Sequence, residues 1–471
     1  MKVSGLKKNL YFALGAEGLQ LLQSILMSLI IPRILGVEQF GFWQLFIFYT
    51  SYGGFFHLGL LDGIYLKIGG KYGNDIDYKS LACQLKFLII WLFLILLPIA
   101  IWGYFNTNTN RTIVIISSCI YIFLYNILSF HSYVLQCINN IKAYSLGRFI
   151  DMFTFICGLF VLMFGKSTFF VPYIIVYFIA KLLCLFYFSL CLKTLWHYIF
   201  TRLNKSVFKE IFDNIKVGIN LLASNIASML ILGIGRWLVD KEWGIQSFSK
   251  VSFSLIFVNF FLMFIQQASM VLFPDLRRRD QKQIVSVYSL MVSIIYCIVP
   301  FALICYLPFV LIIKYWLPLY GDSINYLVYL LPLCCFETKM QLIYNTMFKV
   351  LRMEKKLFLC NAIALFISLM LFLFAVFMLK SLIAVVIAMF IAIFIRSFIA
   401  EILIERKLFK NRLSSVCKDI VPELVMVSIF IFIMNNFSLC IGSCMYLFFV
   451  ILFVVLNHKK YKILIKAKTK V

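Results

Sequence analysis

Long apolar runs recur along the whole chain, and they constrain the fold more than any other feature of the sequence. Each run holds roughly 18 residues or more, which is enough to cross a bilayer as a helix. The chain is 63% hydrophobic and only 13% charged, whereas soluble domains are near 45–50% and about 25%. The sequence therefore predicts an all-α, polytopic membrane protein.

Fourteen segments fit membrane helices. They cover residues 10–31, 42–66, 81–103, 112–138, 149–165, 169–192, 217–239, 250–273, 284–313, 324–348, 357–379, 382–404, 420–436 and 438–456. The ninth contains Pro300 and Pro308, so we expect a kink there. The first run is too long for a signal peptide and lacks a small-residue cleavage site, so it is interpreted as a membrane helix.

The distribution of basic residues supports this helix count. With the N-terminus in the cytoplasm, the inside segments hold 32 of the 44 Lys and Arg residues, the outside loops 7, and the helices 5. Such a bias is typical of correctly counted membrane helices, so the net charge of +25 mainly reflects topology. The basic C-terminal tail is expected to contact anionic lipids, and nucleic-acid binding is not expected.

A short motif suggests an internal repeat. The stretch Ile31–Gly41 matches Gly235–Gly244 when shifted by 203 positions, which aligns Arg33 with Arg236 and Gly41 with Gly244. This predicts two pseudo-symmetric six-helix bundles. The expected domains are an N-terminal bundle over residues 1–192, an amphipathic cytoplasmic linker over 193–216, a C-terminal bundle over 217–404, and two extra helices with the tail over 405–471.

The sequence contains no recognisable catalytic chemistry. It has no nucleophile elbow, no Walker-type phosphate loop and no His-Glu metal spacing, which excludes an ATP-driven pump within this chain and predicts no enzyme activity. Most of the fourteen cysteines lie in apolar runs, and the four histidines are far apart. We therefore expect no catalytic residue, no metal site and no cofactor.

Polar residues inside the predicted helices are the informative ones, because a charge at a helix centre should face an interior or a cavity. In the first helix Glu17, Gln20, Ser24 and Ser28 fall within an arc of about 80°, and in the seventh Asn220, Ser224 and Ser228 do the same. These stripes predict two cavity walls. Hydrogen bonding between helices is the alternative interpretation.

Five basic residues are candidates for binding an anionic passenger. Arg33 and Arg236 lie near helix ends, where they could bind phosphate or extend to the interface. Three others lie well inside apolar runs, where they could instead pair with Glu337, Glu401 or Glu17; they are Lys181, Lys339 and Arg396.

Three acidic residues are candidates for ion coupling or gating: Glu17, Asp62 and Glu337. Asp62 and Asp151 are predicted near inner helix ends. Asp62 is flanked by Gly59 and Gly63, which allow close helix approach.

Several motifs are similar to those of bacterial polysaccharide exporters. Pro32-Arg33-Ile-Leu-Gly36, Phe40-Gly41 and His57-Leu-Gly59-Leu-Leu-Asp62-Gly63 resemble the opening of O-antigen flippases of the Wzx type. Gly218-Ile-Asn220, Ser247-Phe-Ser249 and Leu272-Phe-Pro274 add similarity in the second half. The resemblance covers roughly residues 9–72 and 216–277 and points to the multidrug/oligosaccharidyl-lipid/polysaccharide (MOP) superfamily more firmly than to one member.

The resemblance implies a two-bundle, alternating-access flippase in the bacterial cytoplasmic membrane, with both termini in the cytoplasm. Its substrate would be an undecaprenyl-diphosphate-linked oligosaccharide for O-antigen, capsule or exopolysaccharide synthesis, and other polysaccharide-assembly proteins could be partners. A lipid II flippase and an ion-coupled multidrug antiporter remain alternatives. A membrane polymerase or ligase is a third, although it should show a long outside loop and none is present.

Overall fold

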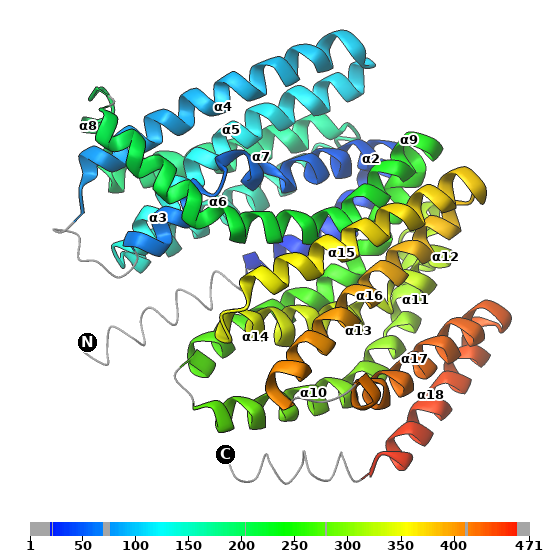
Figure 1. Cartoon of the computed structure of the whole chain (residues 1–471). Helices are drawn as coiled ribbons and strands as arrows, with labels where there is room; N and C mark the ends of the chain where they lie inside the picture. Colours follow the sequence, from blue (N-terminus) through cyan, green and yellow to red (C-terminus); the bar gives the residue numbers. More distant parts are fainter. Residues whose placement is uncertain are drawn as a thin grey trace. The chain divides into compact units, whose positions relative to one another are not determined.

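The computed structural model describes residues 19–20, 22–68, 76–202, 204–277, 280–409 and 413–458. Within these ranges the regular elements are all helices (Figure 1), so the all-α prediction is confirmed. Among the described residues, ten helical stretches are long and apolar enough to cross a membrane, and the bent pair Ser323–Leu330 and Leu333–Val350 would make eleven. The count of fourteen remains a prediction.

The chain divides into two compact units, with the first ending at Ile226 and the second beginning at Ala227. The helices that begin in the first unit are η1 (Leu26–Ile30), α2 (Ile31–Ser51), η2 (Gly53–His57), α3 (Leu60–Ile68), α4 (Tyr78–Asn106), α5 (Thr109–Cys137), α6 (Ile141–Phe164), α7 (Phe170–Cys191), α8 (Lys193–His197) and α9 (Lys205–Arg277). The predicted linker, residues 193–216, falls inside this unit.

The rest of α9 belongs to the second unit. It is followed by α10 (Gln281–Ile304), α11 (Tyr306–Trp316), η4 (Pro318–Tyr320), α12 (Ser323–Leu330), α13 (Leu333–Thr338), η5 (Lys339–Tyr344), α14 (Asn345–Val350), α15 (Glu354–Leu373), η6 (Phe374–Met378), α16 (Leu382–Phe409), α17 (Leu413–Asn436) and α18 (Leu439–Leu456). The predicted kink in the ninth segment appears as the break between α10 and α11 at Cys305.

Aromatic packing forms the centre of the first unit. Trp43 of α2 is fully buried. Its indole lies 5.9 Å from the ring of Tyr177 and 6.5 Å from that of Phe155, which come from α7 and α6. The outward surface is apolar instead: Phe105 is 76% exposed and Phe164 is 85% exposed. Apolar rings on the outside of long apolar helices fit lipid rather than water as the surrounding solvent.

Close backbone contact fixes the beginning of α9 against α3 in the first unit. A Cβ atom on Gly63 would clash with the backbone oxygen of Asn214, and one on Gly218 would clash with that of Gly59. The close approach expected from Gly59 and Gly63 is therefore present. Beside it, the Asn214 amide donates a hydrogen bond to Gln84 Oε1 over 2.8 Å.

Backbone torsion angles show the internal repeat more clearly than the residue identities. Gly36 (φ 69°, ψ 178°) and Gly244 (φ 77°, ψ 179°) interrupt α2 and α9 with the same non-helical conformation. They are 208 positions apart, so the predicted shift of 203, which aligned Gly41 with Gly244, was wrong at this point. The few identical residues fit an offset of either 203 or 208 positions. The glycines that interrupt the two helices fit only an offset of 208.

Two further pairs of turns repeat the same backbone conformation. Asn139 (φ 56°), after α5, corresponds to Arg352 (φ 53°), after α14. Lys166 (φ 48°) and Lys380 (φ 47°) follow α6 and η6 and are each followed by serine. Left-handed φ values are uncommon outside glycine, so their recurrence in the same order supports two structurally related halves.

Candidate functional site

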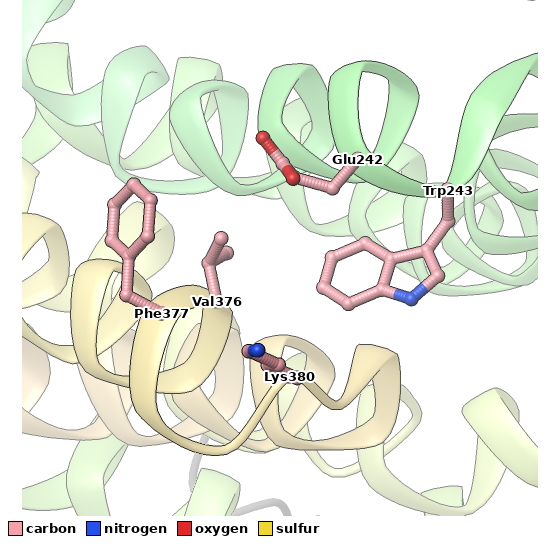
Figure 2. A pocket seen from close by; sticks show the side chains of 5 residues that line it. All are labelled: Glu242, Trp243, Val376, Phe377 and Lys380. Carbon is pink, nitrogen blue, oxygen red and sulfur yellow. The ribbon is translucent and has the colours of Figure 1, made fainter.

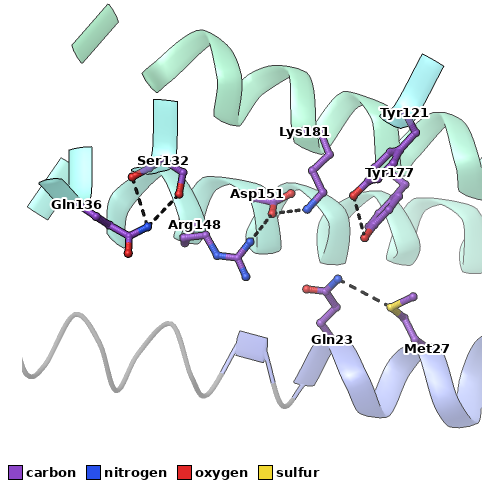
Figure 3. A network of polar contacts seen from close by, with 9 residues as sticks. All are labelled: Gln23, Met27, Tyr121, Ser132, Gln136, Arg148, Asp151, Tyr177 and Lys181. Carbon is purple, nitrogen blue, oxygen red and sulfur yellow. Dashed lines mark hydrogen bonds and ion pairs between the residues drawn. The ribbon is translucent and has the colours of Figure 1, made fainter. Parts of the chain in front are cut away.

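A buried ionic cluster lies between α6 and α7 in the first unit (Figure 3). The Lys181 ammonium donates a hydrogen bond to Asp151 Oδ2 over 2.6 Å, and Arg148 Nη1 reaches the same oxygen over 3.4 Å. The side chains of Lys181 and Asp151 are 8% and 3% exposed, whereas that of Arg148 is 37% exposed. We call Arg148, Asp151 and Lys181 the basic cluster.

Aromatic hydroxyls border the basic cluster. The Lys181 ammonium lies 5.0 Å from the centre of the Tyr177 ring, in a cation–π contact. Tyr121 of α5 stacks on Tyr177, with ring centroids 5.2 Å apart and the two hydroxyl oxygens 3.4 Å apart. Figure 3 also shows Gln23, whose amide donates to the Met27 sulfur over 3.8 Å. Hydroxyl and amide groups therefore accompany the charges.

The composition of the basic cluster suits an anion. Two cations surround one carboxylate, so the three side chains carry a formal charge of +1, and the more exposed Arg148 guanidinium holds its remaining donors available. A guanidinium can bind phosphate oxygens with two parallel hydrogen bonds. Asp151 keeps Lys181 charged and fixed in place.

Three ionic contacts in the described part of the second unit involve buried cations. Arg396 of α16 pairs with Glu337 of α13 and donates to Ser228 of α9 over 2.6 Å. Lys339 of η5 lies 2.7 Å from Glu423 Oε2 of α17 and 3.7 Å from Glu401 Oε2 of α16. As the sequence predicted, Glu337 and Lys339 do not pair with each other. Of the two interpretations that the sequence allowed, anion binding and pairing with acidic residues of other helices, Lys339 and Arg396 show the pairing.

The remaining predicted basic residues are Arg33 and Arg236. Arg33 is exposed in α2. Arg236 is half-buried, donates to Ser252 Oγ over 3.0 Å and lies 5.1 Å from the Phe248 ring centre.

The predicted cavity-wall and coupling residues are dispersed as well. Gln20 and Ser24 are half-buried near the start of the described chain, and Asp62 is half-buried in α3. Asn220 is exposed and Ser224 is buried, both in the part of α9 that belongs to the first unit. Glu17 lies outside the described residues.

Sequence reasoning did not select Arg148 or Glu423 and placed Asp151 too near a helix end. Two helices begin earlier than predicted. Helix α6 begins at Ile141 rather than 149, and α17 at Leu413 rather than 420. One signal was available: the Asn140 side chain accepts a hydrogen bond from the Ala143 amide and caps α6, and asparagine at such a position is a common helix start. Polar residues in the first turns, Lys142 in α6 and Ser414 in α17, hid both helix starts from a hydrophobicity criterion.

A separate surface pocket of about 250 Å³ lies in the second unit (Figure 2). It is lined by Glu242 and Trp243 of α9, Val376 and Phe377 of η6, and Lys380. An aromatic face with a carboxylate and an ammonium beside it can accommodate a polar headgroup. Among the described residues no group of His, Cys, Asp and Glu could hold a metal ion.

Comparison with known proteins identifies the fold. No family model and no curated protein matches the sequence. The lipid II flippase MurJ, in an inward closed conformation, matches with a TM-score of 0.62 and 13% identity, over 96% of this chain and 99% of that one. An inward-facing multidrug resistance MATE family transporter of the MOP superfamily matches with a TM-score of 0.61 and 12% identity, over 85% and 95%.

A third solved structure is a MOP superfamily transporter from Pyrococcus furiosus with a binding pocket of reverse polarity. It matches with a TM-score of 0.53 and 13% identity, over 83% of this chain and 93% of that one. With its long apolar helices, the chain is an integral membrane protein that has the fold of these transporters.

Proposed function

We propose that this protein is a flippase that moves an undecaprenyl-diphosphate-linked oligosaccharide across the bacterial cytoplasmic membrane. The observation that carries the proposal is the basic cluster, in which Arg148 and Lys181 surround Asp151 with an excess of positive charge. A diphosphate is a compact dianion, and buried cations are an expensive feature that an organic-cation exporter would not need. The passenger is therefore anionic.

Within this proposal the basic residues have different tasks. Arg148 and Lys181 contact the diphosphate, with Asp151 positioning both. Arg396 and Lys339 hold their helices together through Glu337 and Glu423. Arg33 and Arg236 remain candidates for phosphate contact at helix ends, and Glu17, Asp62 and Glu337 remain candidates for ion coupling or gating. The half-buried Gln20 and Ser24, with Asn220 and Ser224, are proposed to line the path of the polar headgroup.

A lipid II flippase is the second candidate. The MurJ alignment covers 96% of this chain, whereas the two MATE alignments that carry an argument cover 85% and 86%. The extra length is what two additional C-terminal helices would require, which favours a lipid-linked substrate over a drug cation. The motif resemblance to Wzx-type exporters favours the polysaccharide unit over lipid II. Neither candidate needs a cofactor or a nucleic acid, and both place the protein among enzymes that assemble glycans.

The proposal can be tested in sealed vesicles. Purified protein is reconstituted with a labelled undecaprenyl-diphosphate oligosaccharide, and its exposure to an outside probe is followed over time. We expect movement with wild type, loss with Arg148→Ala and Lys181→Ala, and retention with Lys166→Ala, a basic residue in a turn of the same unit. Movement of lipid II alone would select the second candidate. Export of an organic cation without movement of either lipid would refute the proposal.

A further inference from the structure

The carboxyl group of Glu401 is buried with too few partners for an ionised side chain. Its side chain is 1% exposed within α16. Oε2 accepts a hydrogen bond from the Tyr344 hydroxyl over 2.5 Å, and Oε1 has no hydrogen-bond partner in the described structure. The Lys339 ammonium is 3.7 Å away, beyond hydrogen-bond length. A buried carboxylate is normally held by several donors or a close cation, because it has lost its water.

The Lys339 ammonium forms its closer ion pair with Glu423 rather than with Glu401. It lies 2.7 Å from Glu423 Oε2, a full ångström closer than to Glu401. The contact with Glu423 is therefore a close ion pair, whereas the contact with Glu401 is a longer one. The Lys339 ammonium therefore pairs mainly with Glu423, and its interaction with Glu401 is the weaker of the two.

We propose that Glu401 is a proton-binding site. A protonated carboxyl is neutral, so it needs no cation, and the hydrogen bond that the Tyr344 hydroxyl donates to Oε2 is kept. One ammonium and one proton then balance the two buried carboxyl groups of Glu401 and Glu423. When Lys339 shifts from Glu423 to Glu401, the proton moves from Glu401 to Glu423, which has lost its close cation. The site is therefore a switch with two arrangements: Lys339 on Glu423 with Glu401 protonated, or Lys339 on Glu401 with Glu423 protonated.

The backbone around the site fits a switch. Lys339 and Tyr344, the two residues that approach Glu401, are the first and last residues of η5, a π-helix. Such segments are rare and often occur at functional positions. A rearrangement of η5 would move both partners of Glu401 together.

Other titratable groups surround the site. Glu405, one turn further along α16, is 7% exposed, and Tyr288 of α10 and Cys335 of α13 interact electrostatically with members of the network. Glu423 of α17 and Lys339 complete the set. Glu405 is a second buried carboxyl on the same helix, so it serves as the matched control.

Infrared spectroscopy tests the proposal without any transport substrate. In reconstituted full-length protein at neutral pH, we expect a carbonyl stretch from one protonated carboxyl, lost in Glu401→Gln and unchanged in Glu405→Gln. Tyr344→Phe should keep this band at a shifted frequency, because only Glu401 receives that hydrogen bond. A band that persists unshifted in Glu401→Gln and Tyr344→Phe would overturn the proposal, as would its absence in wild type.

Thermal unfolding gives an independent readout. Glutamine has the shape of a protonated glutamic acid, so Glu401→Gln should unfold at the wild-type temperature at neutral pH. A large loss of stability would mean that Glu401 is an ionised partner of Lys339 and would overturn the proposal.

The use of this proton in transport rests on the proposed function. In the vesicle assay, we expect Glu401→Gln to move lipid-linked oligosaccharide with at least a tenfold weaker response to an imposed proton gradient. An intact infrared band with no lipid movement in any variant would reject the flippase and keep the proton site. A wild-type response to the gradient in Glu401→Gln would overturn the role of Glu401 in coupling.

Discussion

At the scale of single residues, the decisive feature is how each buried cation is balanced. Lys181 and Arg148 share one carboxylate in the first unit, whereas Arg396 and Lys339 each have a close acidic partner in the second. A buried ion pair adds little net stability, because desolvation cancels much of the attraction, but removing one member leaves an expensive unpaired charge. Removing one member of a pair should therefore cost much more stability than removing both. Comparing single and double variants can thus separate a structural role from a functional one.

The first prediction concerns the pair of Lys181 and Asp151. Lys181→Gln leaves the buried Asp151 with only the longer Arg148 contact, so we expect a loss of about 3–5 kcal/mol in the free energy of unfolding. The double variant with Asp151→Asn should recover most of it. Lipid movement should stay lost in both variants. Recovery of movement in the double variant would show that the pair is only structural.

The second prediction concerns Arg148, whose side chain is partly exposed. Solvent weakens its contact with Asp151, so Arg148→Gln should change the free energy of unfolding by no more than about 1 kcal/mol. Lipid movement should nevertheless fall at least tenfold, because a phosphate donor is lost. Thermal unfolding and the vesicle assay on one preparation compare the two effects. A parallel loss of stability and movement would remove Arg148 from the site.

At the scale of helices, hydrophobicity predicted which segments are helical and failed at their charged ends. Apolar length is enough to find α5 or α7, since burial in lipid or in the core drives both. It placed Asp151 and Glu423 near the ends of their helices, because it missed the first turns of α6 and α17, which contain polar residues. The sequence named Glu401 as a possible partner of the buried cations, but it did not assign Asp151 to Lys181 or Glu423 to Lys339, since these pairs depend on how the helices pack.

The third prediction concerns the contact between α3 and α9. Gly63→Ala places a methyl group against the backbone of Asn214, which cannot move aside as a side chain could. We expect a cost of about 1–3 kcal/mol in the free energy of unfolding. Gly54→Ala is the control, because its Cβ would meet only His57 Nε2 at 3.8 Å. Equal unfolding temperatures for the two variants would contradict the close packing.

At the scale of the whole molecule, the sequence predicts which end of each helix faces the cytoplasm. Glu354–Met378 is one span, so the turns at its two ends should lie on opposite sides of the membrane. The charge distribution places Lys380 outside and Glu354 inside. In a variant without its native cysteines, Lys380→Cys should react with an impermeant maleimide in intact cells, and Glu354→Cys only after lysis. The reverse pattern would invert the topology.

The sequence spacing of the repeated turns differs slightly between the two halves. The offset between matching landmarks grows from 208 at Gly36 and Gly244 to 213 at Asn139 and Arg352, then to 214 at Lys166 and Lys380. The last step locates a one-residue insertion between Arg352 and Lys380. In the first copy this segment is the α-helix α6, while in the second it ends in the π-turn η6, a distortion that absorbs one surplus residue without breaking the helix. The two halves thus differ by one residue in this segment, and the π-turn accommodates it while both flanking turns keep their conformation.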